Sequence, residues 1–239
     1  MGTRIREANV WDERAEAYRR APEHRAGADL DRLVEWCEPG EGVEALDVAT
    51  GGGNVARRLR EVGCRVTTCD AAPGMRPDVV CRAEDLPFAG GSFDVAVTRI
   101  APHHFEDVGA AVRELARVSR RLVVVEDTLF ADERVEEAER LRDPTHVRSY
   151  TEAEWRGMLE EAGLAVEAVE SFEKRHPLEG WLARTGCAGA EAERVRELLA
   201  DRIDGDDYVD TKILFKALKR HEALTGTVPV KEVSRTLEP

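Results

Sequence analysis

Apolar residues recur along this chain in short runs at strand spacing and in longer stretches at helical spacing. In the first run, Val43, Leu46 and Val48 precede a cluster of glycines, a pattern that predicts a buried strand followed by a turn. The strongly apolar stretch that begins at Leu122 predicts a central strand that is covered on both faces. We expect strands at residues 43–48, 65–69, 78–82, 93–97, 122–127, 165–172 and 210–218.

Helical patterns fill the intervals between these runs, and the alternation indicates an α/β fold with parallel strands. Thr151 and Glu154 have the spacing of a capping box and predict the start of a helix. Residues 132–142 are charged with mixed sign and predict a solvated surface helix. Residues 71–77 are too few for a full helix, so we expect a shortened crossover there. Other helices are expected within residues 8–37, 54–62, 106–118, 151–163, around 181 and within 190–201.

The turn after the first strand is the strongest candidate for chemistry. Gly51, Gly52 and Gly53 allow a sharp bend and let a ligand approach the backbone. The second strand then delivers a carboxylate at Asp70, where an acid in a parallel sheet reaches the ribose hydroxyls of a nucleotide. The unit therefore predicts a site for an adenosine-containing cofactor.

Three interpretations compete at this turn. Gly51-x-Gly53-x-x-Ala56 fits the dinucleotide fingerprint, which is a weak signal by itself. Asp47-x-Ala49-x-Gly51-x-Gly53 is similar to the first motif of class I S-adenosylmethionine-dependent methyltransferases, with Ala49 in place of the usual first glycine. A glycine turn without any ligand is less favoured, because the carboxylate is also in place.

Composition narrows the classes of protein further. With 239 residues, 42% hydrophobic and 35% charged, the chain can bury a full core and is typical of a soluble globular protein. Its net charge of −13 argues against a broad nucleic-acid surface. No apolar run approaches the roughly 20 residues that span a bilayer, and no signal-peptide core is present, so we expect a cytoplasmic protein. The cysteines lack CxxC spacing, and we expect neither a disulfide nor a metal site.

Further motifs follow the glycine turn in a fixed order. They are Leu46-Asp-Val-Ala-Thr-Gly-Gly-Gly-Asn-Val-Ala, Asp70, Ala83-Glu-Asp-Leu-Pro-Phe88 and Ser92-Phe-Asp-Val, with His24-x-x-Gly27-x-Asp-Leu, Arg99-x-x-x-His-His-Phe105 and Leu141-Arg-Asp-Pro-x-His-x-Arg148. Over roughly residues 10–220 the chain resembles the small class I methyltransferases typified by the ubiquinone/menaquinone-biosynthesis methyltransferases. The resemblance implies a Rossmann-like α/β fold with a seven-stranded, mostly parallel sheet in the order 3-2-1-4-5-7-6 and an antiparallel last strand.

The resemblance also implies S-adenosylmethionine as cofactor and S-adenosylhomocysteine as product. Gly51 and Gly53 would let the backbone approach the methionine moiety, and Asp70 would accept hydrogen bonds from both ribose hydroxyls. An Asp commonly precedes the Ala of the Ala-Glu-Asp-Leu-Pro-Phe element, and here Arg82 replaces it. The residues that it implies around the cofactor are Asp47, Ala49, Gly51, Gly53, Asn54, Asp70, Ala71, Met75, Ala83, Glu84, Arg99, Tyr18 and His24.

Methyl transfer is a direct displacement, so the protein mainly has to align the acceptor with the methyl group. A base is needed only if the nucleophile loses a proton, and the candidates are His103, His104 and His146. Three arginines could bind a carboxylate or phosphate of the acceptor, or could pair with acidic side chains of this chain. They are Arg99, Arg142 and Arg148.

We expect N-terminal helices over residues 1–42 that cover cofactor and substrate, a methyltransferase domain over 43–220 and a tail over 221–239. The leading hypothesis is a methyltransferase for a small-molecule acceptor. One alternative directs the same chemistry at tRNA or protein, and another is a cofactor-binding module that transfers no methyl group. The sequence leaves the acceptor, its nucleophilic atom and a homodimer open.

Overall fold

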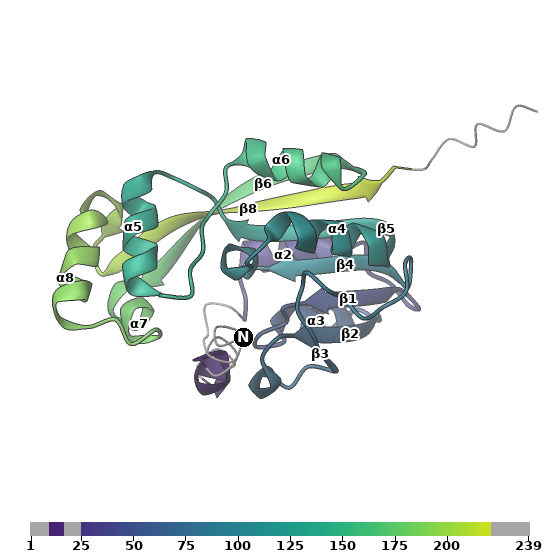
Figure 1. The fold of residues 1–239 in the computed structure, drawn as a ribbon, viewed down its shortest axis with the longest axis horizontal. Coiled ribbons are helices and arrows are strands. Elements are labelled where there is room, and N and C mark those ends of the chain that lie inside the picture. Colours follow the sequence, from purple (N-terminus) through teal and green to yellow (C-terminus); the bar gives the residue numbers. More distant parts are fainter. Residues whose placement is uncertain (1–9, 17–24, 221–239) are drawn as a thin grey trace, which may run out of the picture.

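The computed structural model describes residues 10–16 and 25–220, so the expected tail and two expected cofactor residues, Tyr18 and His24, lie outside it. Within these ranges strands and helices alternate, as the apolar pattern predicts (Figure 1). The strands are β1 (Glu44–Val48), β2 (Arg65–Asp70), β3 (Val79–Val80), β4 (Phe93–Arg99), β5 (Ser119–Thr128), β6 (Leu164–Pro177), β7 (Ile203–Asp204) and β8 (Asp207–Lys219). The helices are α2 (Ala28–Trp36), α3 (Asn54–Glu61), α4 (Val108–Val118), α5 (Glu133–Arg142), α6 (Glu152–Glu161), α7 (Leu178–Ala183) and α8 (Gly189–Leu198), with 3₁₀ turns η2 (Pro73–Met75), η3 (Pro102–His104) and η4 (Ala200–Arg202).

The strands form one sheet in the order β3-β2-β1-β4-β5-β8-β6, with the short β7 paired to β8. Strands β1 to β5 are parallel, whereas β8 runs antiparallel to both β5 and β6. The expected sheet order is confirmed, with β8 as the seventh strand and β7 as a two-residue addition. Because β1 and β4 are parallel, they end at the same edge of the sheet, and the loops that follow them lie side by side there.

Helices cover both faces of the sheet, and the alternation of side chains along the central strands explains this. On β4, Val95 and Val97 pack with α2 and α3, while Ala96 points to the opposite face with α4 and α6. On β5, Val123 and Val125 pack on the α4 side. Both faces of the central strands are thus buried, which accounts for their near-continuous apolar sequence.

The crossover from β2 to β3 contains no α-helix, as its length predicts. Its residues form only the 3₁₀ turn η2, in which Met75 is buried. The third strand is shorter than expected, because only Val79 and Val80 pair with β2. This short connection keeps Met75 close to the end of β2.

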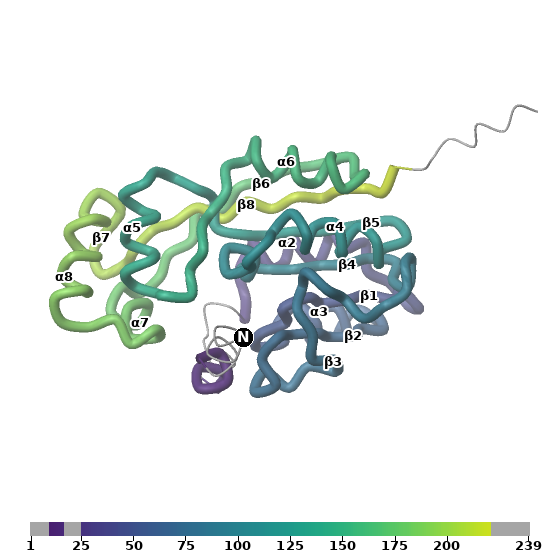
Figure 2. Tube along the Cα trace, viewed as in Figure 1, coloured from purple at the N-terminus to yellow at the C-terminus, as the bar shows by residue number. Residues whose placement is uncertain are grey.

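The hairpin of β6 and β8 is much longer than the sequence pattern predicts. It pairs from Leu164 with Lys219 to Pro177 with Asp207, whereas β5 pairs with β8 only as far as Lys212. The outer half of the hairpin, with α5, α7 and α8, forms a separate group of elements beside the sheet (Figures 1 and 2). We call residues 133–142 and 173–210 the hairpin lobe.

Helix α5 is not the solvated helix that its charge pattern predicts. Its Val135 and Ala138 are buried in the core of the hairpin lobe with residues of α7, α8 and β8. Glu136, Glu139 and Arg142 of the same helix are also buried, and each has a polar partner. The charged residues indicated exposure, but these three are buried together with their partners.

Within residues 10–16 and 25–220, the helices are too short or too polar to cross a membrane.

Candidate active site

The turn between β1 and α3 takes its shape from left-handed backbone and one buried carboxylate. Gly51 and Gly53 have φ angles of 51° and 71°, and Ala49, where the resemblance leads us to expect glycine, has a φ of 55°. Asp47 at the end of β1 accepts hydrogen bonds from the Thr50 hydroxyl at 2.6 Å and from a backbone N–H of α3 at 3.1 Å. Burial raises the pKa of Asp47 to about 6. The left-handed residues and the Asp47 hydrogen bonds thus fix the backbone of the turn, as a ligand-binding loop requires.

Asp70 joins the end of β2 to this turn. One carboxylate oxygen accepts the Gly51 N–H and the other accepts the Ala72 N–H, both at 2.9 Å. Burial raises the pKa of Asp70, and these N–H groups act in the opposite direction. Each carboxylate oxygen can accept a further bond, and Asp70 lines a cavity of about 320 Å³. Its position fits the ribose diol of an adenosine cofactor.

The cavity continues past four more of the residues that the resemblance implies around the cofactor. Ala71, Met75, Ala83 and Glu84 all line it. Arg82 also lines it and pairs with Glu84 at 3.2 Å and with Glu106 at 2.9 Å. The cation that replaces the usual carboxylate is therefore balanced by acids on both sides.

Arg99 lines the cavity but is engaged with carboxylates of its own chain. Its guanidinium bonds Asp29 of α2 at 2.5 Å and Glu126 of β5 at 2.8 Å, and all three side chains are buried. Burial alone would lower the pKa of Arg99, but Glu126 and Asp29 raise it. Lys174 of β6 contacts the same Asp29. Of the two roles considered for Arg99, pairing with acidic side chains is the one these contacts support.

His103 and His104 follow β4 in η3 and line the middle of the cavity. Nδ1 of His103 lies 2.5 Å from Oδ1 of Asp127, near the end of β5. Burial lowers the pKa of His103 well below its usual value and raises that of Asp127 to about 7. His104 donates from Nδ1 to the Thr145 carbonyl at 3.1 Å, and its ring packs edge-on against Trp11.

His146 does not line the cavity, which corrects the expectation that it acts there as a base. It is buried behind His103, with ring centroids 5.4 Å apart, and its Nε2 lies 3.1 Å from Glu136. Arg148 also lies elsewhere, paired with Glu154 at 2.7 Å. A loop sequence does not reveal which way its side chains turn.

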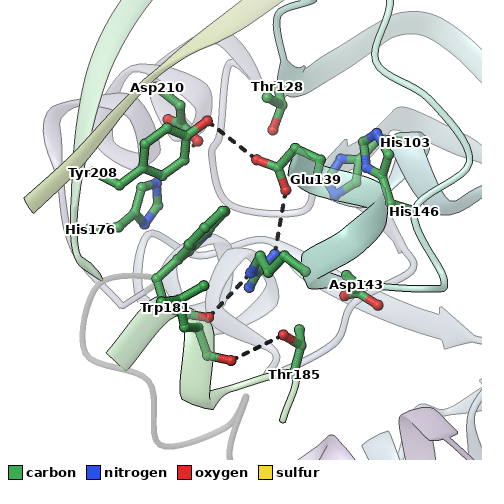
Figure 3. Close-up of polar contacts among 12 residues, drawn as sticks. His103, Thr128, Glu139, Asp143, His146, His176, Trp181, Thr185, Tyr208 and Asp210 are labelled. Atoms are coloured by element: carbon green, nitrogen blue, oxygen red, sulfur yellow. Dashed lines mark hydrogen bonds and ion pairs between the residues drawn. The ribbon is translucent and has the colours of Figure 1, made fainter. Parts of the chain in front are cut away.

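The far end of the cavity is formed by the hairpin lobe, the end of β5 and the start of β8, and of its lining residues the sequence analysis named only Arg142 as a candidate (Figure 3). Arg142 donates to the Trp181 carbonyl at 3.2 Å and pairs with Glu139 at 3.6 Å, so of the two roles considered for it these contacts support pairing within the chain. For Thr128 the available signal was the rule that ligands bind at the carboxyl ends of parallel strands. The residues that line this end are Thr128, Glu139, Arg142, His176, Trp181, Arg184, Asp210 and Lys212.

Among the expected cofactor residues within the described ranges, all but one line this cavity. The exception is Gly53, which directly precedes α3. At Gly51, which lines the cavity, a Cβ would meet only the Ala49 carbonyl oxygen at 4.0 Å, so the backbone of the turn leaves space for a ligand. The fold and this site define an α/β protein built to hold an adenosine-containing cofactor at the carboxyl ends of parallel strands.

Comparisons with known proteins identify the family. A profile described as "Methyltransferase domain" matches residues 46–123. The chain is 30% identical to the uncharacterized methyltransferase YcgJ of Bacillus subtilis over 213 residues, which cover 79% of this chain and 82% of that protein. It is 38% identical over 112 residues to a demethylmenaquinone methyltransferase of Beutenbergia cavernae, covering 41% of this chain and 45% of that protein.

Solved structures agree with this match. The BH2331 protein of Bacillus halodurans superimposes with a TM-score of 0.72 at 25% identity, covering 82% of this chain and 100% of that one. The chain therefore belongs to the class I S-adenosylmethionine-dependent methyltransferases, of the UbiE-like type. Its cofactor is S-adenosylmethionine, which displaces the dinucleotide interpretation of the glycine turn.

Proposed function

We propose that this methyltransferase acts on a small molecule that occupies the cavity between His103 and the hairpin lobe. The observation that carries the proposal is the continuity of the cavity, which runs from Asp70 through His103 to Lys212. Its volume of about 320 Å³ lies at the lower end of the range for small-molecule sites. The relatives named for demethylmenaquinone and ubiquinone/menaquinone biosynthesis support an acceptor of this kind.

Bound S-adenosylmethionine would supply a methyl group that its sulfonium already activates for displacement. We assign to His103 the removal of a proton from the acceptor, because it lines the cavity between the two ends. When Asp127 is ionised, its Oδ1 accepts a hydrogen bond from Nδ1–H of His103 at 2.5 Å. Nε2 of His103 then carries no proton and can accept one from the acceptor. The glycine turn and the ends of the parallel strands would hold the methyl donor and the acceptor in line.

Residues 10–16 support the proposed cover over the site. They are helical, and Asp12 accepts the Gly74 N–H beside Met75 at 2.5 Å. Arg14 pairs with Asp143 at 3.0 Å and donates to the Thr185 carbonyl in the hairpin lobe at 3.2 Å. One short segment thus bridges the cofactor end and the hairpin lobe, as a lid over both ligands would.

The test is methyl transfer to a pool of metabolites freed of macromolecules, with S-adenosylmethionine labelled as CD₃. We expect at least one small product with the label, absent without enzyme. His103→Gln should lower its rate by roughly 10²–10⁴-fold, the usual contribution of a general base, while calorimetry shows S-adenosylhomocysteine binding unchanged. The same assay is run on the tRNA and protein removed from that pool, and label that enters only these fractions would reject the small-molecule proposal.

A further inference from the structure

A cluster of buried polar side chains closes the acceptor end of the cavity, on the β6–β8 hairpin. Oδ2 of Asp210 accepts from Nζ of Lys212 at 2.6 Å and from Nε2 of His176 at 3.2 Å. The same ammonium donates to Oγ1 of Thr128 at 2.7 Å. Asp210, Lys212 and His176 are each at least 95% buried, and all four residues line the cavity.

Two atoms of this cluster are left without a hydrogen bond. Oδ1 of Asp210 and Nδ1 of His176 are buried and have no partner among the residues that the structure describes. Buried polar groups are rarely left unpaired, because each one carries a desolvation penalty. Side chains that line a cavity and hold such atoms indicate a place where a ligand completes the network.

The chemistry of the two atoms defines the missing partner. Oδ1 of the Asp210 carboxylate can only accept. Nδ1 of His176 also accepts when Nε2–H donates to Asp210, which is the tautomer that satisfies this contact. Both vacancies therefore call for a donor, an O–H or N–H of the ligand. The oxygen of the Thr128 hydroxyl already accepts from Lys212, so its proton is available to donate to an oxygen of the same ligand group.

Charge favours a neutral group over an anion. Lys212 balances Asp210 at 2.6 Å, and Arg142 lies 3.6 Å from Glu139, so both of these cations have acidic neighbours. A ligand carboxylate in this place would face the Asp210 oxygen and be repelled.

The wall beside the cluster is aromatic. Trp181 lines the cavity beside Tyr208 (Figure 3), with the Tyr208 ring centroid 4.5 Å from its own and the guanidinium of Arg142 4.2 Å from its ring centroid. These contacts hold the indole in place, and because Trp181 is only 3% exposed it offers a small, rigid apolar contact that suits the edge of an aromatic ligand. The polar cluster and this wall together select a ring that bears a hydrogen-bond donor.

From this arrangement we infer that Asp210 and His176 form a specificity subsite that binds a neutral hydroxyl of a ring-shaped acceptor against Trp181. The inference rests on the proposed function for the choice of this end as the acceptor site. It adds that the acceptor carries a hydroxyl remote from His103 and that Asp210 recognises its proton.

The experiment measures binding of three matched probes to the protein saturated with S-adenosylhomocysteine, by ligand-observed NMR titration. The probes are 2-naphthol, 2-methoxynaphthalene, which lacks the donor, and 2-naphthoate, which is an anion. We expect 2-naphthol to bind about tenfold more tightly than its methyl ether, the usual effect of one hydrogen bond to a charged group. It should also bind more tightly than the carboxylate.

Asp210→Asn should reduce the preference for 2-naphthol over the ether to less than about twofold, because Lys212 and His176 take the one amide oxygen and the NH₂ donor then stands where Oδ1 accepted. Glu139→Gln is the matched control, since this acid lines the same end but already lies 3.4 Å from the Tyr208 hydroxyl, and the preference should survive. Unchanged affinity for S-adenosylhomocysteine in both variants shows that they fold.

Preference for 2-naphthoate, a preference that survives Asp210→Asn, or no binding of 2-naphthol would each overturn the inference. These results can be distinguished from failure of the proposed function. If the proposed function fails, no small molecule is methylated, whereas probe binding is measured without turnover in the protein saturated with S-adenosylhomocysteine.

Discussion

The two ends of the cavity are built in different ways. The cofactor end comes mostly from one stretch of chain, residues 47–84, and the hydrogen bonds that shape its glycine turn use backbone N–H groups, such as those from Gly51 and Ala72 to Asp70. The end that we propose for the acceptor, called the acceptor end below, comes from α5, α7 and three strands, and it is shaped by side-chain pairs such as Lys212 with Asp210. Backbone geometry suits a cofactor that never changes, and exchangeable side chains suit an acceptor that differs among relatives.

The two ends should also differ in how strongly substitutions lower the free energy of unfolding. At the cofactor end, Asp70 is held by two backbone N–H groups and needs no cation. At the acceptor end, buried charges depend on one another, and removal of one leaves the other uncompensated. Substitutions should therefore destabilise the acceptor end more than the cofactor end.

The largest effect on stability is expected for Lys212→Met. It leaves the buried Asp210 carboxylate without the cation that lowers its pKa, and the free energy of unfolding should fall by about 3–5 kcal/mol. Urea denaturation measures this. Lys216→Met on the same strand should cost less than about 1 kcal/mol, because its partners Glu38 and Glu167 are exposed. Equal losses would remove the contrast between the two kinds of site.

The pH dependence of kcat/KM tests the pair of His103 and Asp127, which we propose as the base. Burial raises the pKa of Asp127 to about 7. Below this pH, protonated Asp127 donates to Nδ1 of His103, so the single imidazole proton sits on Nε2 and no base faces the acceptor. We expect kcat/KM to rise about tenfold per pH unit up to pH 7 and then to level off. Asp127→Asn should abolish this rise, and a profile that declines with pH would exclude the pair as base.

A smaller effect is expected at the cofactor end from Asp70→Ala. The variant loses charge-assisted hydrogen bonds to the ribose, each of which contributes on the order of 1.5–3 kcal/mol. Calorimetry should show the Kd for S-adenosylhomocysteine raised by at least about tenfold. Asp85→Ala is the control, because Asp85 is exposed and does not line the cavity. Equal affinity of the Asp70 variant and the unmodified protein would refute the ribose assignment.

The smallest effect is expected for Ala49→Gly. Ala49 has a φ of 55°, a region that strains any residue with a Cβ, so glycine should stabilise the protein by up to about 1 kcal/mol. Ala45→Gly in β1 is the matched control and should destabilise it by a similar amount. Thermal unfolding distinguishes the two, and a loss of stability in both would show that the turn is unstrained.

Prediction from sequence succeeded where structure depends on neighbours in the chain. The strand, glycine turn, helix and Asp70 lie within about one βαβ unit, so local spacing was enough to place them on one edge. The shortened crossover followed from counting residues. The position of His103 at the cavity followed from the rule that loops after parallel strands lie at the ligand site, whereas its role as a base stays a prediction.

The acceptor end could not be predicted in this way. His176 and Asp210 lie 34 positions apart in the sequence and meet only because β6 and β8 extend past β5. His146 has the residue type and the motif of a catalytic base, yet it bonds Glu136 away from the cavity. The chain pattern alone thus predicts an adenosine-cofactor site, because short-range geometry encodes it, and the resemblance of the motifs to a methyltransferase family implies the cofactor and the reaction class. Which side chains face the acceptor depends on long-range strand pairing and on the direction in which each buried side chain turns.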